Sequence, residues 1–179
     1  MDLENKKILF IDLDGTLIEV VKGKENSPFP EDVTDFRIRK QVLDQIISKL
    51  PHLSHIEIVT NQAGVPLYYS HEEMTAKLTA IRTFIFHYIN KEKPAGTVMI
   101  SVAYQVCFSI DKDDPMRKPN TGMLDFFSAH RGESKEEMLM IGDASGIKTE
   151  VRHDFSDSDK MCAQNFGIDY LDIDDFLSL

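Results

Sequence analysis

Two aspartates separated by one residue follow an apolar run near the start of the chain, in the stretch "FIDLDGTLI" that begins at Phe10. Residues i and i+2 of an extended segment point the same way, so Asp12 and Asp14 can face one ligand. Two carboxylates this close repel each other and weaken a strand. The pair therefore indicates a site that uses both acids.

Other polar residues follow apolar runs further along the chain. Thr60 and Asn61 come at the end of "IEIVTN", Asp143 follows "MLMIG", and Lys118 lies in "MRKPNTGM". Because ligands of an open parallel sheet bind outside the carboxyl ends of its strands, we expect these residues to share one crevice with the aspartate pair.

The chemistry of this set fits a metal ion and a phosphoryl group. Converging carboxylates are best offset by a hard divalent cation with oxygen ligands, for which Mg²⁺ is the natural choice. The Thr60 hydroxyl and the Lys118 charge suit the anionic oxygens of a phosphoryl group while an oxygen nucleophile attacks in line. Taken singly, each of these residues is more often a helix cap or a solvated charge.

The elements that would position these residues alternate between strands and helices. Apolar runs predict strands over 7–11, 56–60, 97–104, 138–142 and 168–173, and helical periodicity predicts helices over 36–50, 71–90, 123–129 and 158–167, with a final turn over 174–179. Glycine and prolines in 17–35 indicate a short hairpin or flap followed by a loop. This order predicts an α/β fold with a doubly wound parallel sheet, Rossmann-like, with a short flap after the first strand.

Composition limits the class of protein. With 179 residues, of which 42% are hydrophobic, we expect a single domain over 1–179. Cys107 and Cys162 lie too far apart in sequence for a metal cluster or a disulfide framework, which favours a reducing, intracellular setting in cytoplasm or nucleus. No apolar run approaches the ~20 residues that span a bilayer, so we expect neither secretion nor membrane insertion. The formal charge of −10 argues against broad coating of nucleic acid but not against gripping one end.

The motifs also resemble those of a known superfamily. "DLDGT", "TNQ", "RKPNTGM" and "GDASG" occur in the order of the four motifs of the haloacid dehalogenase superfamily of aspartate-based phosphatases. Within it, "TDFRI", "RKPNTGM", "GDASG" and "DFSDSDKMCAQNFGIDYLDIDDFL" resemble the phosphatase domain of polynucleotide kinase 3'-phosphatase over nearly the whole chain. The long insertion between "GDASG" and "SDSD" is specific to that branch.

This resemblance implies roles for individual residues. Asp12 would be the nucleophile and Asp14 the general acid and then base. Asp12, the backbone carbonyl of Asp14 and Asp143 would hold Mg²⁺. Thr60, Asn61 and Lys118 would bind the phosphate. Arg37 of "TDFRI" would contact a phosphodiester, and Asp159 takes the place of a second acid in the fourth motif, where it would touch the metal, a water or Lys118.

Departures from the family pattern leave alternatives open. Relatives commonly carry a basic stretch soon after "TNQ", where this chain reads "AGVPLYYS". A cationic contact with the nucleic-acid backbone is therefore either missing or replaced by stacking of bases on Tyr68 or Tyr69. Ordinary loop packing is the competing interpretation of these tyrosines. No G-x-x-x-x-G-K-[ST] motif occurs, so we expect no kinase domain.

The function predicted from the resemblance is a Mg²⁺-dependent polynucleotide 3'-phosphatase of DNA end repair that acts through a phospho-aspartate. Gaps between the motifs too short for a cap domain predict an open, capless site that admits DNA 3'-phosphate ends at single-strand termini or nicks, in a monomer. A small-metabolite phosphomonoesterase of the histidinol-phosphatase-like branch is the alternative, favoured by the acidic charge and the missing basic stretch. A non-catalytic phosphate-binding module is a third hypothesis, although every catalytic position is filled.

Overall fold

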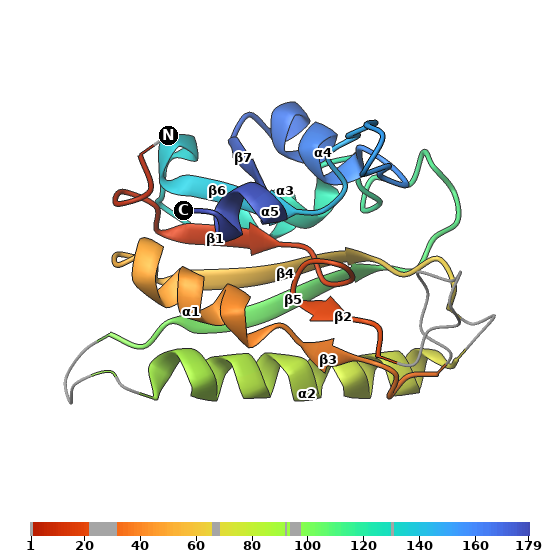
Figure 1. Cartoon of the computed structure of the whole chain (residues 1–179), viewed down its shortest axis with the longest axis horizontal. Coiled ribbons are helices and arrows are strands. Elements are labelled where there is room, and N and C mark those ends of the chain that lie inside the picture. The colour runs from red at the N-terminus through yellow and green to blue at the C-terminus, as the bar shows by residue number, and fades with distance from the viewer. Residues whose placement is uncertain (1, 22–31, 66–68, 92, 94–97, 130) are drawn as a thin grey trace.

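A computed structural model describes residues 2–21, 32–65, 69–91, 93, 98–129 and 131–179. Its centre is a five-stranded sheet in which every neighbouring pair is parallel, with the order β5-β4-β1-β6-β7 (Figure 1). The strands are β1 (Ile8–Ile11), β4 (His55–Asn61), β5 (Ser101–Cys107), β6 (Met138–Gly142) and β7 (Asp169–Asp172). The chain crosses back over the sheet between β5 and β6, which makes the carboxyl end of β1 the topological switch point where such folds bind ligands.

Helices cover both faces of this sheet. One apolar core joins the sheet to α1 (Lys40–Lys49), α2 (His71–Asn90) and α5 (Ile173–Leu177), and a second joins it to α3 (Gly122–Ser128) and α4 (Ser158–Phe166). A short 3₁₀ turn over Lys135–Glu137 precedes β6. The side chains of β1 alternate between the two cores and all four of its residues are fully buried, as expected for a central strand covered on both faces. The predicted doubly wound α/β fold is confirmed.

The ends of the longest helix follow local chemistry. Ser70 accepts a hydrogen bond from the backbone N–H of Glu73, and the Glu73 carboxylate accepts one from the backbone N–H of Ser70. This capping box satisfies donors that a helix N-terminus leaves unpaired. The helix then runs over 71–90, which is the predicted range.

The flap after the first strand is a small antiparallel pair, and it corrects one predicted boundary. Strand β2 (Ile18–Glu19) pairs with β3 (Arg37–Ile38) beside the main sheet (Figure 1). The predicted helix over 36–50 is therefore wrong at its start, because α1 begins only at Lys40. Ile38 fits the helical spacing, but its pairing with Ile18 and the bond from Arg39 N–H to the Leu17 carbonyl hold this segment extended. Residues 22–31 of the predicted flap lie outside the described residues.

A second boundary differs at the edge of the sheet. The predicted strand over 97–104 is displaced, because β5 runs over Ser101–Cys107. Its register is set by β4, whose His55 and Asn61 lie opposite Ser101 and Cys107. Pairing with a neighbour, which the apolar pattern does not encode, therefore decides where this edge strand begins. Within the described part of the chain, no helix is both long and apolar enough to cross a membrane.

Candidate active site

Motif one leaves the central strand in a tight turn that fixes both aspartates. The backbone N–H of Asp12 donates to the Ile141 carbonyl on β6 at 3.0 Å, and that of Gly15 donates to the Ile18 carbonyl at 2.9 Å. Arg39 reaches back to the same turn, where its Nη1 donates to the Gly15 carbonyl at 2.5 Å. The side chain of Arg39 thus supports motif one, a role that sequence reasoning missed.

Three carboxylates meet at the carboxyl ends of β1 and β6. One oxygen from each of Asp12, Asp143 and Asp159 lies within 4.8 Å of the other two, so the three could hold a metal ion. Asp12 and Asp143 directly follow β1 and β6, while Asp159 comes from the first turn of α4. Asp12 and Asp159 are 7% and 1% exposed, which is rare for charged groups without partners. Carboxylate oxygens are the ligands that Mg²⁺ and Ca²⁺ prefer, so the donor set fits a hard divalent cation.

Lys118 is the buried counter-charge of this cluster. Its Nζ lies 2.6 Å from Asp12 Oδ1, 2.7 Å from Asp159 Oδ1 and 2.8 Å from the Val59 carbonyl oxygen. Asp159 therefore contacts Lys118, one of the three partners that the sequence left open for it. The predicted contact of Lys118 with phosphate stays a prediction.

Burial and the crowding of charge shift the acid–base properties of the cluster. Burial raises the pKa of Asp12 well above its usual range; Lys118 opposes this effect, while Asp159 and Asp143 add to it. Burial and the charge of Asp159 raise the pKa of Asp143 to about 6. Burial alone would lower the pKa of Lys118, but its attraction to Asp12 and Asp159 outweighs burial and raises that pKa. Part of the rise in pKa at Asp12 and Asp143 comes from the neighbouring carboxylates, whose repulsion a bound cation would relieve.

Two glycines allow the carboxylates to approach the backbone. A Cβ on Gly15, which has a φ of +81°, would lie 2.1 Å from Asp143 Oδ2. A Cβ on Gly142 would lie 2.2 Å from Asp159 Oδ2. The glycine of "DLDGT" is thus needed both for the left-handed turn and for the space that Asp143 occupies.

Asp14 lies in a different environment from Asp12. Its Oδ2 accepts a hydrogen bond of 2.5 Å from the Gln62 amide, and that same amide nitrogen lies 2.8 Å from Thr60 Oγ1. Thr60 and Gln62 share one side of β4 and its extension, as residues two apart on a strand do. This period-two relation was the available signal for Gln62, which sequence reasoning did not include among the site residues.

Asn61 points to the opposite side and holds the loop that carries Lys118. Its Nδ2 donates to the Lys118 carbonyl at 2.9 Å, and its Oδ1 accepts from the Lys118 N–H at 3.0 Å. The amide of Asn61 thus bonds to the Lys118 backbone in both directions, which positions that loop, while the predicted contact of Asn61 with phosphate stays a prediction.

The loop after β6 is fixed by Arg152, which lies in the insertion between "GDASG" and "SDSD". Its guanidinium donates to Asp172 at 2.8 Å, to Asp154 at 2.7 Å and to the Asp143 carbonyl at 2.9 Å. Asp154 in turn accepts from the backbone N–H of Ser145 at 3.1 Å. Arg152 therefore ties the segment that carries Asp143 to the end of β7.

The remaining predicted residues lie on the flap and just before α2. Arg37 is on the flap, where its side chain is 70% exposed and pairs with Glu19 at 2.8 Å. Tyr69 is half-buried against the main core, and burial together with the charge of Asp14 raises the pKa of its hydroxyl. This placement favours loop packing for Tyr69, while Tyr68 lies outside the described residues.

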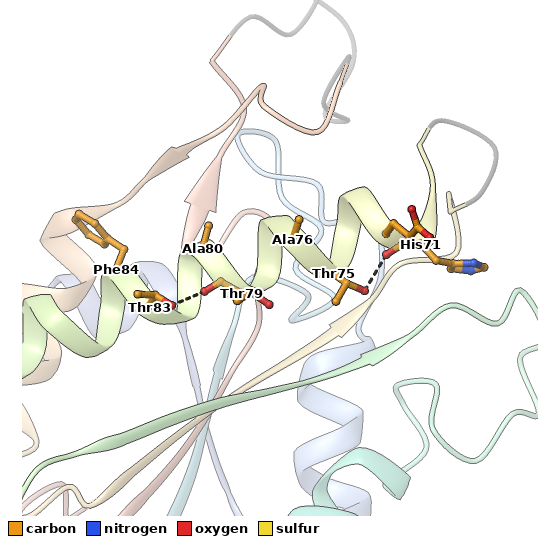
Figure 2. Close-up of a pocket in the computed structure, with 8 residues that line it drawn as sticks. His71, Thr75, Ala76, Thr79, Ala80, Thr83 and Phe84 are labelled. Carbon is orange, nitrogen blue, oxygen red and sulfur yellow. Dashed lines mark hydrogen bonds between the residues drawn. The ribbon is translucent and has the colours of Figure 1, made fainter.

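One hollow of the surface lies along α2, away from the acidic cluster. A groove of about 920 Å³ runs along the outer face of α2, past Thr75, Thr79, Thr83 and Phe84 (Figure 2). Thr75 and Thr83 donate to carbonyls one turn earlier in their own helix, each at 2.8 Å. Because none of the three clustered aspartates lines this groove, it is not the candidate reaction site.

Known structures share this fold. A D,D-heptose 1,7-bisphosphate phosphatase from B. bronchiseptica, crystallised with magnesium and phosphate, superposes with a TM-score of 0.59 at 14% identity, covering 96% of each chain. A HAD-like phosphatase from Mesorhizobium loti gives 0.53 at 21% identity over 92% of this chain and 70% of its own. An uncharacterized protein from Listeria monocytogenes gives 0.58 at 18% identity, over 93% and 77%. The chain therefore has the fold of haloacid dehalogenase-like phosphatases.

Sequence comparison narrows this class to one family. The sequence model described as polynucleotide kinase 3 phosphatase matches residues 7–177, so the chain belongs to that family. A 20.8 kDa protein of Autographa californica nuclear polyhedrosis virus, named for the FGF-VUBI intergenic region, is 29% identical over 177 residues, which are 97% of this chain and 86% of the viral protein.

Proposed function

We propose that this chain removes the 3'-phosphate from polynucleotide ends in a Mg²⁺-dependent reaction that passes through phospho-Asp12. Membership of the polynucleotide kinase 3 phosphatase family supports the substrate class. The observation that carries the mechanism is the division of environments at motif one: Asp12 is buried against the Lys118 ammonium, whereas Asp14 is held by the neutral amide of Gln62.

This division suits two different roles. In the first step a carboxylate oxygen of Asp12 attacks the phosphorus, the bond from phosphorus to the sugar 3'-oxygen breaks, and Asp14 gives its proton to that oxygen. In the second step Asp14 takes a proton from water, whose oxygen attacks the phosphorus and breaks its bond to Asp12. Inorganic phosphate leaves, and both aspartates return to their starting states.

The cation would be held by Asp12 and Asp143, together with the backbone carbonyl of Asp14. Its charge would offset the crowded carboxylates and the negative charge of the phosphoryl group. The magnesium and phosphate in the heptose bisphosphate phosphatase support this assignment, as does the oxygen-only donor set. Thr60 and Lys118 would supply a hydroxyl and a positive charge to the phosphoryl oxygens, and Gln62 and Asn61 would position them.

The substrate test compares a 3'-phosphorylated DNA oligonucleotide with a panel of sugar and amino-alcohol phosphates. We expect kcat/KM to be highest on the oligonucleotide, and we expect no transfer of phosphate from ATP to a 5'-hydroxyl. In a site without a cap domain, a DNA end would reach Asp12 by passing the flap. The exposed side chain of Arg37 on the flap would then contact the DNA strand. For the Asp12→Asn variant, Asp175→Asn is a matched control, because Asp175 is an exposed acid on α5.

A second candidate is a phosphatase of small sugar phosphates. The structural likeness to a heptose bisphosphate phosphatase and the formal charge of −10 favour it. A kcat/KM on a sugar phosphate that exceeds the value on the oligonucleotide would select this candidate and reject polynucleotide ends as the substrate.

A further inference from the structure

A second cavity lies between motif one, the flap and α2. It measures about 220 Å³, and its polar lining consists of Asp14, Glu19, Asp35 and Lys77, with apolar walls from Ile18 and Phe36. Liquid water takes about 30 Å³ per molecule, and drug-sized pockets begin near 300 Å³, so the space suits a group about the size of a sugar ring. Because Asp14 lies in its wall, the cavity is on the side where the proposed acid would meet the leaving oxygen.

Lys77 is the unusual residue of this cavity. Only 4% of it is exposed, and its Nζ has no hydrogen-bond partner among the described residues. The ammonium lies 4.9 Å from the centre of the Phe36 ring, a contact that recovers part of its lost hydration. Burial lowers the pKa of Lys77, while the charges of Asp14 and Asp35 raise it. A buried ammonium with three unused hydrogens is costly unless something else accepts them.

The charges around Lys77 decide which kind of ligand the cavity could bind. Asp14 and Asp35 offset its positive charge, and Glu19 is paired with Arg37 on the flap. A second phosphate would therefore meet little net positive charge. A neutral oxygen-rich ring can accept from the ammonium, donate hydroxyls to the Asp35 carboxylate and pack on Ile18 and Phe36.

Building on the proposed function, we propose that this cavity binds the sugar of the leaving group and that Lys77 donates a hydrogen bond to one of its oxygens. Lys77 is then a substrate-binding residue that selects sugar-linked phosphates over other phosphomonoesters. Lys77 is the seventh residue of α2 and belongs to none of the four motifs.

The test compares Lys77→Met with the parent chain on deoxythymidine 3'-phosphate, a 3'-phosphorylated oligonucleotide, ribose 5-phosphate and p-nitrophenyl phosphate. Methionine keeps the apolar stem of lysine and removes the donor. Arg82→Met is the control, because Arg82 is exposed on the same helix. We expect Lys77→Met to lose 10- to 100-fold more kcat/KM on the sugar phosphates than on p-nitrophenyl phosphate, since hydrogen bonds to charged groups are worth that factor.

A binding measurement separates this role from an effect exerted through Asp14. In the Asp12→Asn background, Lys77→Met should weaken the binding of deoxythymidine 3'-phosphate at least tenfold relative to the binding of inorganic phosphate. A residue that only tuned the acid would leave this ratio unchanged and would instead move the pH profile of kcat.

The outcomes separate the cavity from the proposed function. Equal losses on all four substrates, an unchanged binding ratio, or no cleavage of any sugar phosphate by the parent chain would overturn the sugar pocket. A loss confined to the oligonucleotide would also overturn it, because it would assign Lys77 to an internucleotide phosphate. Cleavage of ribose 5-phosphate alone, with the Lys77 effect intact, would reject polynucleotide ends while supporting the pocket.

Discussion

Gly15→Ala is expected to remove phosphatase activity at a small cost in stability. A left-handed φ costs a non-glycine residue about 1–2 kcal/mol. The new Cβ would also lie 2.1 Å from Asp143 Oδ2, so the two must part by about 1.3 Å to reach the 3.4 Å of ordinary contact. A displacement of about 1 Å at a reacting centre costs roughly 100-fold in rate, so we expect a loss of at least that factor.

Gly167→Ala is the matched control for this experiment. Gly167 has nearly the same φ, +79°, but a Cβ there would have no atom within 4 Å. Urea unfolding should give both variants a similar loss of about 1–2 kcal/mol. Turnover of p-nitrophenyl phosphate with saturating Mg²⁺ should fall only in Gly15→Ala. If Gly15→Ala keeps more than a tenth of parental activity, or if Gly167→Ala loses as much, the close approach of Asp143 is not what the site requires.

Other perturbations test the site and the core separately. Asp12→Asn should abolish turnover with the fold intact, because an amide is a poor nucleophile, and activity near that of the parent would rule out the covalent step. EDTA should stop turnover and added Mg²⁺ should restore it, whereas full activity in metal-free buffer would contradict the cation site. Arg152→Met should lower kcat at least tenfold and the free energy of unfolding by about 2–3 kcal/mol, because it removes the hydrogen bonds that join Asp172 to the Asp143 carbonyl. An unchanged kcat would show that the Asp143 loop keeps its position without Arg152. Glu57 on β4 is fully buried, and burial raises its pKa from 4.5 to about 7, so the folded state holds its proton more tightly than the unfolded state. The free energy of unfolding should therefore fall as pH rises from 4.5 to 7. Glu57→Gln should be more stable than the parent by up to about 3 kcal/mol at pH 8, and this gain should vanish toward pH 4.5. Urea unfolding of both proteins over this pH range measures the gain, and a gain independent of pH would assign the effect to packing.

The sequence pattern was sufficient to predict those strands and helices whose own residues determine where they lie. The continuous apolar run before Asp12 predicts a strand covered on both faces, and the apolar spacing of 71–90 gives the bounds of α2. Asp12 and Asp14 could be assigned to one ligand because residues two apart on an extended segment face the same way. These features depend on neighbours in the sequence, which is why they can be predicted without the fold.

The tertiary structure decided which distant groups meet and what each side chain contacts. Lys118 lies 106 residues from Asp12 along the chain, and its place between Asp12 and Asp159 depends on how the β5 loop and α4 cross the ends of β1 and β6. Ile38 fits a helical pattern but pairs with Ile18, because a ladder partner outweighs weak local propensity. Asn61 and Gln62 are adjacent in one motif, yet one holds the Lys118 backbone and the other holds Asp14, since alternate residues of a strand face opposite sides. Lys77 looks like an ordinary polar residue of an amphipathic helix, and only the flap that closes over it turns it into a buried cation beside the site.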